Sequence, residues 1–368
     1  MFEQSLINIL SKNFYARLFS GWNLYVCYFL DAGRQKDESE EMSLGRNRPR
    51  YAARLNAFKA IIDGRPNLEN LIGAAADVKG LHAADLNYPD HFDSYSDTTI
   101  TSILNDAGMA LNGVAVRFYS YPEFRLGAFT NPNQAIRRAA IDITKRAIDR
   151  TAELGGDLMT LWMGQDGFDY SFQLDYSRAW DDTINGFREV AAHNPNVNIS
   201  VEYKPSEPRA FALMPDVGST LLAVKETGAE NIGVTIDFAH VLVADEMPAH
   251  AASMIGRYSQ LLGVHLNDGY GKRDDGIMVG ATHPVQTVEL FVVLEQLEYD
   301  GVIYFDTFPD DGGLDPREEC RTNILAAERF RQIAADLAQD GDLPAAIAAQ
   351  DATISHRIII DRLYGGTK

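Results

Sequence analysis

The chain has 368 residues, of which 46% are hydrophobic and 23% charged, and its formal net charge is −19 at pH 7. This composition is typical of a globular protein with a large core, and the negative charge argues against nucleic acid or an anionic membrane as the main partner. The two cysteines, Cys27 and Cys320, exclude a disulfide framework and a Cys-x-x-Cys site. The N-terminus lacks a signal-peptide pattern and no apolar run approaches ~18 residues, so we expect a cytoplasmic protein without membrane spans.

Short apolar runs that end in polar residues alternate with longer amphipathic segments along the chain. Such runs are typical of parallel strands that are buried on both faces. The expected strands are, in chain order, residues 24–30, 81–88, 113–119, 158–163, 199–204, 232–238, 261–266 and 302–306. The expected helices include residues 133–154, 176–193, 285–297, 316–339 and 345–364. Asn133 could cap the first of these helices, and Gly155 follows its end.

Eight strands that alternate with helices predict an α/β fold, a (β/α)8 TIM barrel with a C-terminal helical extension. A doubly wound open sheet is the alternative, but the segment after the first strand, LDAGRQKDESEE (30–41), lacks the Gly-rich phosphate loop of that fold. The polar segment 31–50 is expected to be a loop or lid. We expect a catalytic barrel domain over residues 1–315. Residues 316–368 would pack on the barrel or on a partner in a homo-oligomer, a dimer or tetramer.

Four consecutive expected strands carry a possible metal ligand near their carboxyl ends. Taken singly, Asp237 could cap a helix, His265 could be a satisfied core histidine, and Asp306 could start a loop. Because the carboxyl ends of barrel strands converge on one mouth, we expect these side chains to meet there. Three carboxylates and one imidazole suit Mn²⁺, Co²⁺ or Mg²⁺. The expected ligands are Glu202, Asp237, His265 and Asp306.

A lysine and further acidic residues surround this expected site. Glu202 and Lys204 are two residues apart and therefore point to the same side of their strand, although a surface ion pair would explain them equally well in isolation. His240 follows Asp237 by three residues and could reach the same cation or a neighbouring one. The loop NDGYGKRDDG (267–276) contains three aspartates that either are solvated or help to hold a second cation sharing Asp237.

These segments together resemble the xylose isomerase-like TIM barrels, which include xylose and rhamnose isomerases. VEYKPSEPR (201–209) is close to the Glu-x-Lys-Pro-x-Glu-Pro-Arg segment of xylose isomerases. The stretches 124–142, 161–167 and 272–280 resemble, in order, their segment before the fourth strand, their Trp-Gly-Gly strand end and their second-metal loop. The resemblance runs from about Val114 to about Pro309, and the first 110 residues are much less clear.

The resemblance implies roles for individual residues. Lys204 would contact the sugar oxygen that changes between carbonyl and hydroxyl, which agrees with the stabilisation that a cation gives to a developing alkoxide. Trp162 and Phe118 would form an apolar wall against the sugar carbons. A first metal, Mn²⁺ or alternatively Co²⁺ or Mg²⁺, would be held by Glu202, Asp237, His265 and Asp306. A weaker second metal would be held by Asp237, His240 and Asp274.

Three departures from the family pattern affect these expectations. The second-metal loop reads Asp274, Asp275, Gly276 in place of Asp-x-Asp, so one ligand is displaced or missing. The histidine at 265 resembles the rhamnose isomerase branch. In LHAADLNYPDHF (81–92), the position of the ring-opening histidine is taken either by His82 or, as we favour, by Asn87 with His91 nearby. In the latter case ring opening proceeds differently, or the substrate is not a cyclic aldopyranose.

The sequence therefore predicts a metal-dependent intramolecular oxidoreductase that interconverts an unphosphorylated aldose and ketose. By the resemblance, a metal-assisted hydrogen shift would run between C1 and C2. The expected catalytic residues are Lys204, Glu202 and Asp306, and the expected substrate contacts are Trp162, Phe118, Asn87 and His91. A ketose 3-epimerase of the same superfamily is the alternative. Such an enzyme needs two carboxylates that act as acid and base from opposite sides, and this site also contains carboxylates. A phosphodiesterase is disfavoured by the negative charge, and an inactive barrel by the complete first set of ligands.

Overall fold

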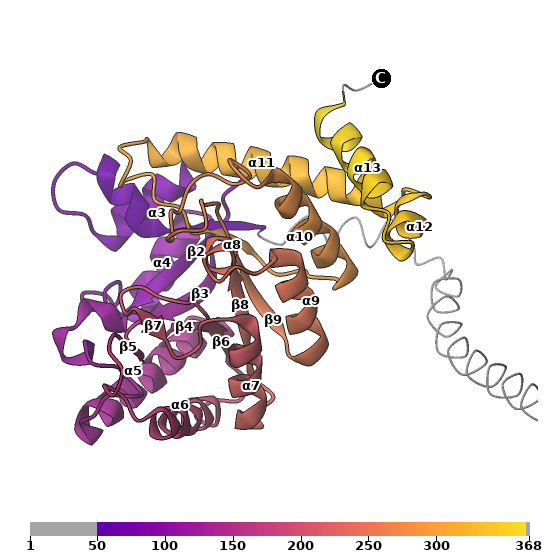
Figure 1. Cartoon of the computed structure of the whole chain (residues 1–368). Coiled ribbons are helices and arrows are strands. Elements are labelled where there is room, and N and C mark those ends of the chain that lie inside the picture. The colour runs from indigo at the N-terminus through magenta and orange to yellow at the C-terminus, as the bar shows by residue number, and fades with distance from the viewer. Residues whose placement is uncertain (1–49, 366–368) are drawn as a thin grey trace, which may run out of the picture. The chain divides into compact units, whose positions relative to one another are not determined.

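The computed structural model describes residues 50–365, and in them eight parallel strands form a closed barrel (Figure 1). Around the barrel the strands follow the order β1-β10-β9-β8-β6-β4-β3-β2. This confirms the predicted (β/α)8 TIM barrel. The barrel strands are β1 (Tyr51–Ala53), β2 (Ala83–Tyr88), β3 (Ala110–Val116), β4 (Leu158–Trp162), β6 (Asn198–Glu202), β8 (Ile232–Asp237), β9 (Leu261–Leu266) and β10 (Ile303–Phe305).

The first strand is where the sequence prediction was wrong. The expected strand 24–30 lies outside the described residues, but the barrel is already closed by β1, which pairs with both β10 and β2. Strand β1 contributes only Tyr51, Ala52 and Ala53, all buried. Three residues are too few to form a recognisable apolar run, whereas residues 24–30 form a longer one. The other seven predicted strands are confirmed.

Helices cover the outside of the barrel, and polar side chains fix where several of them begin. Asn133 caps α5 (Gln134–Glu153) as predicted, and Asp175 and Asp216 cap α6 (Tyr176–Ala191) and α7 (Val217–Thr227). The predicted helix at 285–297 is α10 (Pro284–Gln296). The sequence analysis did not assign α3 (Leu68–Ala76), α4 (Asp97–Asp106), α7, α8 (Phe238–Val243) or α9 (Pro248–Tyr258).

The barrel strands are buried on both faces because the helices cover them outside and side chains fill them inside. All six residues of β8 are buried, and the apolar side chains of the strands and helices form one continuous core. This packing explains why the strands read as uninterrupted apolar runs. A short antiparallel pair, β5 (Gly167–Phe168) with β7 (Phe211–Ala212), joins the loops that follow β4 and β6. No helix within residues 50–365 combines the length and the apolar character that crossing a membrane would need.

The C-terminal region consists of three helices. Helix α11 (Pro316–Ala338) follows β10 and packs against α10 and the short helix η1 (Leu55–Ile61), so it holds the place of the barrel's eighth outer helix. The helix predicted at 345–364 is broken into α12 (Leu343–Ala348) and α13 (Ala352–Tyr364). The division of the chain into domains at residue 315 stays a prediction.

Candidate metal centre

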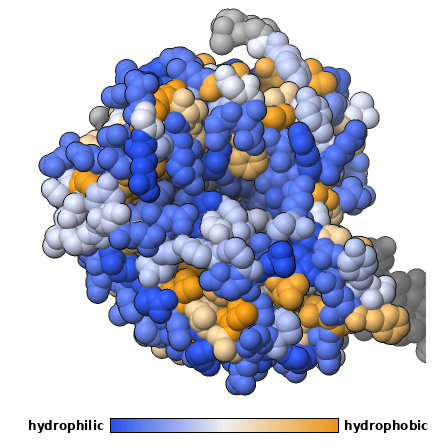
Figure 2. Space-filling view, turned by 90° about the vertical axis from the view of Figure 1, so that its left-hand side faces the viewer, coloured by the Kyte–Doolittle hydropathy of each residue, from blue (hydrophilic) through white to orange (hydrophobic). Residues whose placement is uncertain are grey.

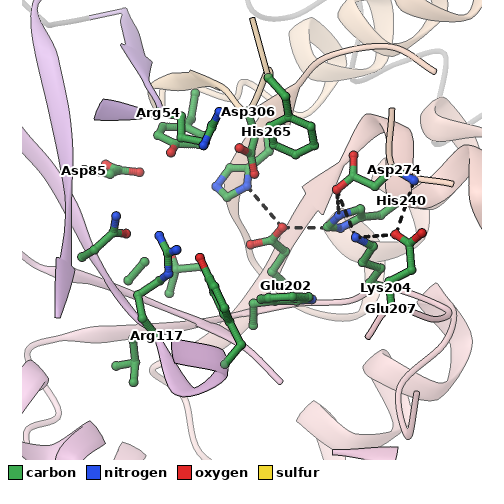
Figure 3. Close-up of a pocket in the computed structure, with 18 residues that line it drawn as sticks. Arg54, Asp85, Arg117, Glu202, Lys204, Glu207, His240, His265, Asp274 and Asp306 are labelled. Atoms are coloured by element: carbon green, nitrogen blue, oxygen red, sulfur yellow. Dashed lines mark hydrogen bonds and ion pairs between the residues drawn. The ribbon is translucent and has the colours of Figure 1, made fainter. Parts of the chain in front are cut away.

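A cavity of about 370 Å³ lies at the carboxyl ends of the barrel strands. The space-filling view shows a hollow that opens among mainly hydrophilic side chains (Figure 2). Side chains of charged residues from six of the barrel strands and the loops after them line this cavity (Figure 3). It is therefore the place where the four predicted ligands should meet.

The structure brings the four predicted ligands of the first cluster together. Glu202 and Asp237 end β6 and β8, His265 lies within β9, and Asp306 directly follows β10. One ligand atom from each residue lies within 4.8 Å of the ligand atoms of the other three. His265 Nδ1 is 3.5 Å from Glu202 Oε1. This geometry follows from the barrel, since neighbouring parallel strands carry their last residues to the same rim.

A second cluster shares Asp237 with the first and adds His240 and Asp274. His240 Nε2 lies 3.1 Å from Asp274 Oδ2, while His240 Nδ1 lies 3.0 Å from the carbonyl oxygen of Tyr203. A carbonyl can only accept, so Nδ1 carries the proton and Nε2 faces the cluster. Asp237 also caps α8 by accepting a hydrogen bond from His240 N at 3.0 Å. One carboxylate thus caps a helix and belongs to both clusters.

The pKa values in these clusters show how strongly the groups interact. Burial alone would lower the pKa of both histidines, but the charge of Asp237 beside His240 raises its pKa to about 9, and that of Glu202 beside His265 raises its pKa to about 10. Burial raises the pKa of Asp237 to about 7. A cation that binds here must displace protons from the imidazoles, because only the neutral ring is a ligand.

Two buried atoms in the clusters have no hydrogen-bond partner within the part of the chain that the structure describes. They are His265 Nδ1 and Asp274 Oδ1. Buried polar atoms nearly always form hydrogen bonds in folded proteins, so atoms without one in a ring of carboxylates and imidazoles fit a bound cation. The donor set, which consists of oxygen and imidazole nitrogen without thiolate, suits a divalent cation such as Mn²⁺, Co²⁺ or Mg²⁺.

Lys204 lies beside the second cluster. Its Nζ is 3.1 Å from Asp274 Oδ2 and 2.9 Å from Glu207 Oε2, and it is 5.5 Å from the ring centroid of Trp162. Burial would lower the pKa of Lys204, but Asp274 and Glu207 outweigh that effect and keep it raised. Against the effect of burial, the hydrogen bond and charge of His240, and after them those of Lys204, lower the pKa of Asp274 to about 2. Lys204 is therefore a buried, charged group that faces the cavity.

Asn267 supports the clusters and was missed by the sequence analysis. This fully buried residue follows β9 directly, and its Nδ2 donates to both oxygens of Asp237, at 3.3 and 3.2 Å, and to the carbonyl of Asp306 at 2.9 Å. Its Oδ1 accepts from Ala239 N at 2.8 Å. An amide that ties two strand ends together holds the carboxylates in place. Its position directly after the strand that carries His265 was the only signal in the sequence.

The acidic loop 267–276 contains one cluster residue and two structural ones. Asp268 binds the hydroxyl and backbone of Thr282 and the ring of His283. Asp275 accepts from Tyr270 N and pairs with Arg273. Only Asp274 of the three aspartates faces the second cluster. Asp275 therefore adds no ligand to the second cluster, because its carboxylate is held by the loop itself.

Of the four predicted substrate contacts, Trp162 and Asn87 line the cavity, and Phe118 and His91 do not. Phe118 is buried in the core, with its ring centroid 5.2 Å from that of Phe124 and 6.0 Å from that of Phe129. Its neighbour Tyr119 lines the cavity and packs edge-on against Trp162 at 5.3 Å. Arg117 and Tyr119 line the cavity, whereas Phe118, the first residue of the short helix η2 (Phe118–Ser120) that follows β3, packs into the core.

The histidines near β2 do not reach the cavity either. His91 is buried, its Nδ1 accepts a hydrogen bond from Asn87 N at 3.1 Å, and burial lowers its pKa to about 4. His82 is exposed before the start of β2. Instead, β2 presents Asp85 and Asn87 to the cavity, because residues two apart share a face. Asp85 was not identified from the sequence.

Comparisons with known proteins agree with this fold. Residues 72–330 match the family model described as xylose isomerase-like TIM barrel. The xylose isomerase of Thermus thermophilus is 27% identical over 209 residues, which are 55% of this chain and 54% of that protein. The chain thus matches about half the length of this curated relative.

Two solved structures share the fold. A D-tagatose 3-epimerase-like protein has a TM-score of 0.65 at 16% identity, over 78% of this chain and 99% of that chain. The IOLI protein, solved with a bound zinc atom, has a TM-score of 0.60 at 12% identity, over 77% of this chain and 98% of that chain.

The fold and the site define a parallel β/α barrel whose strand ends gather carboxylates and imidazoles around one cavity. The chain belongs to the xylose isomerase-like TIM barrel family.

Proposed function

We propose that the protein is a divalent-metal-dependent sugar isomerase that interconverts an unphosphorylated aldose and ketose by moving hydrogen between C1 and C2. The observation that carries this proposal is the buried ammonium group of Lys204, which lies beside two clusters of ligand-type side chains in one cavity. The match to the xylose isomerase of T. thermophilus supports the same activity.

In this proposal Glu202, Asp237, His265 and Asp306 hold one cation, with Mn²⁺ our first choice, and Asp237, His240 and Asp274 hold a weaker second one. Bound cations would hold the two adjacent sugar oxygens and polarise the carbonyl. The weaker second site follows from its three ligands, because Gly276 stands where the family's loop has another aspartate.

The chain's own groups supply the remaining chemistry. Lys204 presents a positive charge to the oxygen that becomes an alkoxide, and such preorganised charge is worth most in a cavity that excludes water. Trp162 shields the reacting carbons from solvent, and Tyr119 braces it from one side. Glu202 and Asp306 fix the strand-end geometry around the substrate oxygens.

A ketose 3-epimerase is the second candidate, because a solved D-tagatose 3-epimerase-like protein shares the fold and because Glu202 and Asp306 provide two carboxylates on the fifth and eighth barrel strands. Epimerisation requires an acid and a base that face opposite sides of one carbon. Lys204 has no part in that mechanism, and for this reason we place isomerisation first.

A panel of aldoses and ketoses of four to six carbons, containing both neutral sugars and sugar acids, tests the proposal. EDTA-stripped protein is incubated with each sugar with and without Mn²⁺, Co²⁺ or Mg²⁺, and the products are separated by chromatography. Metal-dependent conversion of an aldose to its C2 ketose is the expected result. Ketose-to-ketose conversion would show that the protein is an epimerase and not an isomerase. Absence of any conversion while metal is still bound would contradict both functions.

Replacing Asn267 by alanine is expected to weaken metal binding by about 10–100-fold, the usual cost of losing an outer partner of a metal ligand. Asn267 lies behind Asp237 and Asp306, so its loss frees both carboxylates. Calorimetric titration of stripped protein with Mn²⁺ measures the effect. Asn323→Ala is the matched control, since Asn323 is equally buried but binds Glu319 and Val279. Equal losses in both variants would contradict the assigned role.

We also propose that the protein forms a homo-oligomer through its C-terminal helices. No residue of α13 is buried within the described part of the chain, and Ile354 and Ile360 are 36% and 44% exposed. A helix that leaves isoleucines in water is stabilised when a partner covers them. We expect light scattering to give a multiple of the monomer mass, and Ile354→Glu with Ile360→Glu to shift it toward the monomer. The exposed control Thr353→Glu should leave the mass unchanged; a monomeric wild type would contradict the proposal.

A further inference from the structure

Arg117 lies on the side of the cavity away from the ligand clusters. It directly follows β3, and β3 stands four places from β9 in the closed strand order β9-β8-β6-β4-β3. In an eight-stranded barrel, four places is the opposite wall. Figure 3 shows Arg117 and Asp85 on one side of the cavity, and Lys204, His240 and Asp274 on the other. A ligand that touches Arg117 and the clusters therefore spans the cavity.

The other cationic groups of the cavity wall have carboxylate partners. Lys204 pairs with Asp274 and Glu207, and Arg54 pairs with Asp310. The two histidines of the clusters lie within 3.5 Å of Glu202. Within residues 50–365, Arg117 alone among these wall cations forms neither an ion pair nor a side-chain hydrogen bond, and its Nε is buried without a partner. No dashed line reaches it in Figure 3.

The surroundings of Arg117 hold its guanidinium in place without neutralising it. The guanidinium carbon lies 4.2 Å from the ring centroid of Tyr119, so one face of the group is covered by an aromatic ring. Burial lowers the pKa of Arg117, and Asp90, which lies beyond ion-pair distance, opposes this only partly. Arg117 is half-buried, and a charge that is partly withdrawn from water without a partner is costly. A ligand that brought a negative charge would remove this cost.

A second unpaired polar group lies on the neighbouring strand. Asn87 of β2 pairs in register with Ala115 of β3, two residues before Arg117, and it lines the same cavity. Its side-chain amide makes no hydrogen bond within the described residues. A guanidinium and an amide that line one cavity from neighbouring strands offer several N–H donors, and such donors recognise a planar carboxylate.

We propose that Arg117 and Asn87 bind a carboxylate at the end of the substrate opposite the reacting carbons, so that the substrate is a sugar acid. This inference rests on the proposed function, since it names the substrate class of the same cavity. A single guanidinium matches the single charge of a carboxylate. A phosphate dianion would carry a second negative charge near Asp85, which lines the same wall, and no second unpaired cation is there to balance that charge. The competing explanation is that Arg117 only balances the acidic cavity and touches no ligand.

Calorimetry with open-chain probes separates these explanations. Mn²⁺-loaded protein is titrated with glycolate, D-glycerate, D-erythronate and D-gluconate, and with the polyols of the same length, ethylene glycol, glycerol, erythritol and sorbitol. Glycerol 3-phosphate tests whether the site binds a phosphate in place of a carboxylate. At the best chain length we expect the acid to bind at least tenfold more tightly than its polyol. In Arg117→Gln this advantage should fall by about 10–100-fold, the usual effect of losing a hydrogen bond to a charged group.

Variants and controls make the outcome decisive. Arg117→Lys should retain part of the advantage, because it keeps the charge but loses the two-pronged geometry. Arg146→Gln removes the same charge from an exposed site on α5 and should change nothing. Unchanged Mn²⁺ affinity in Arg117→Gln shows that the fold and the clusters are intact. An acid held only by the cation would keep its affinity in Arg117→Gln, and that result would overturn the proposal. Tenfold preference for glycerol 3-phosphate over D-glycerate, or binding of none of the acids, would also overturn it.

These measurements do not depend on turnover. If acids bind through Arg117 but no sugar is isomerised, the proposed function is wrong and this inference stands. If Arg117→Gln isomerises neutral sugars as fast as the wild type does, the isomerase function stands and the assignment of a sugar acid as substrate is wrong.

Discussion

Replacing Glu202 by glutamine is expected to abolish tight divalent-metal binding and sugar turnover together. Glu202 is buried, and its Oε1 lies 3.4 Å from His240 Nδ1 and 3.5 Å from His265 Nδ1, so it stands between the two clusters. Burial opposes ionisation of Glu202, yet the charge of His265 lowers its pKa, so the group is a carboxylate at neutral pH. Glutamine keeps the shape and removes the charge. The loss of metal affinity should exceed the roughly 10–100-fold cost of losing an outer partner.

The measurement is a calorimetric titration of stripped Glu202→Gln with Mn²⁺, followed by turnover of the sugar identified in the panel. Glu246→Gln is the matched control, because Glu246 is a partly buried carboxylate that binds Tyr203 and the backbone of Val217 outside the cavity. It should keep both metal and activity. A Glu202→Gln protein that bound Mn²⁺ and turned over sugar as the wild type does would refute the assigned metal site.

Replacing Lys204 by methionine is expected to leave metal binding intact and to lower kcat by about 10²–10³-fold, the usual cost of removing a group that stabilises a developing oxyanion. Lys204 contacts Asp274 but ligates nothing, and its loss takes a competing cation away from that carboxylate. Methionine keeps the length and the packing against Trp162. The predicted signature is a fall in kcat with little change in KM, because the interaction is made in the transition state.

Steady-state kinetics and a Mn²⁺ titration on the same preparation check this prediction. Thermal unfolding must be followed as well, since removing one partner of a buried ion pair leaves Asp274 and Glu207 with fewer partners. Lys225→Met, at an exposed position of α7, is the control for the loss of one lysine. Loss of metal from Lys204→Met, or normal kcat with normal metal binding, would each show that the role assigned to Lys204 is wrong.

Taken together, these variants distinguish the two sides of the cavity. Under these proposals Glu202→Gln is expected to act on the cation and Lys204→Met on the reacting oxygen, whereas Arg117→Gln is expected to act on the far end of the ligand. Glu202 ends β6 and Lys204 follows it, whereas Arg117 follows β3 and shares no ion pair with either of them within the described residues. The effects of Arg117→Gln should therefore be separable from those of the other two variants.

The barrel and the grouping of its candidate metal ligands could be predicted from the sequence alone. Seven strands were readable because parallel strands buried on both faces are continuous apolar runs, and β8, with all six residues buried, is the clearest case. The ligand residues were readable because each is a polar residue at the end of such a run, and in a barrel those ends share one rim. Glu202, Asp237, His265 and Asp306 meet for that reason alone.

Features that depend on direction and on contacts between distant segments required the three-dimensional structure. Strand β1 could not be identified from three residues, since its identity comes from pairing with β10 and β2. Phe118 and Tyr119 are neighbours of similar character, and only the course of the chain after β3 turns the second into the cavity. The support that Asn267 gives to Asp237, and the unpaired state of Arg117, arise where segments far apart in the sequence come together. A local pattern records burial and periodicity, but it does not record which side chain of another strand stands opposite.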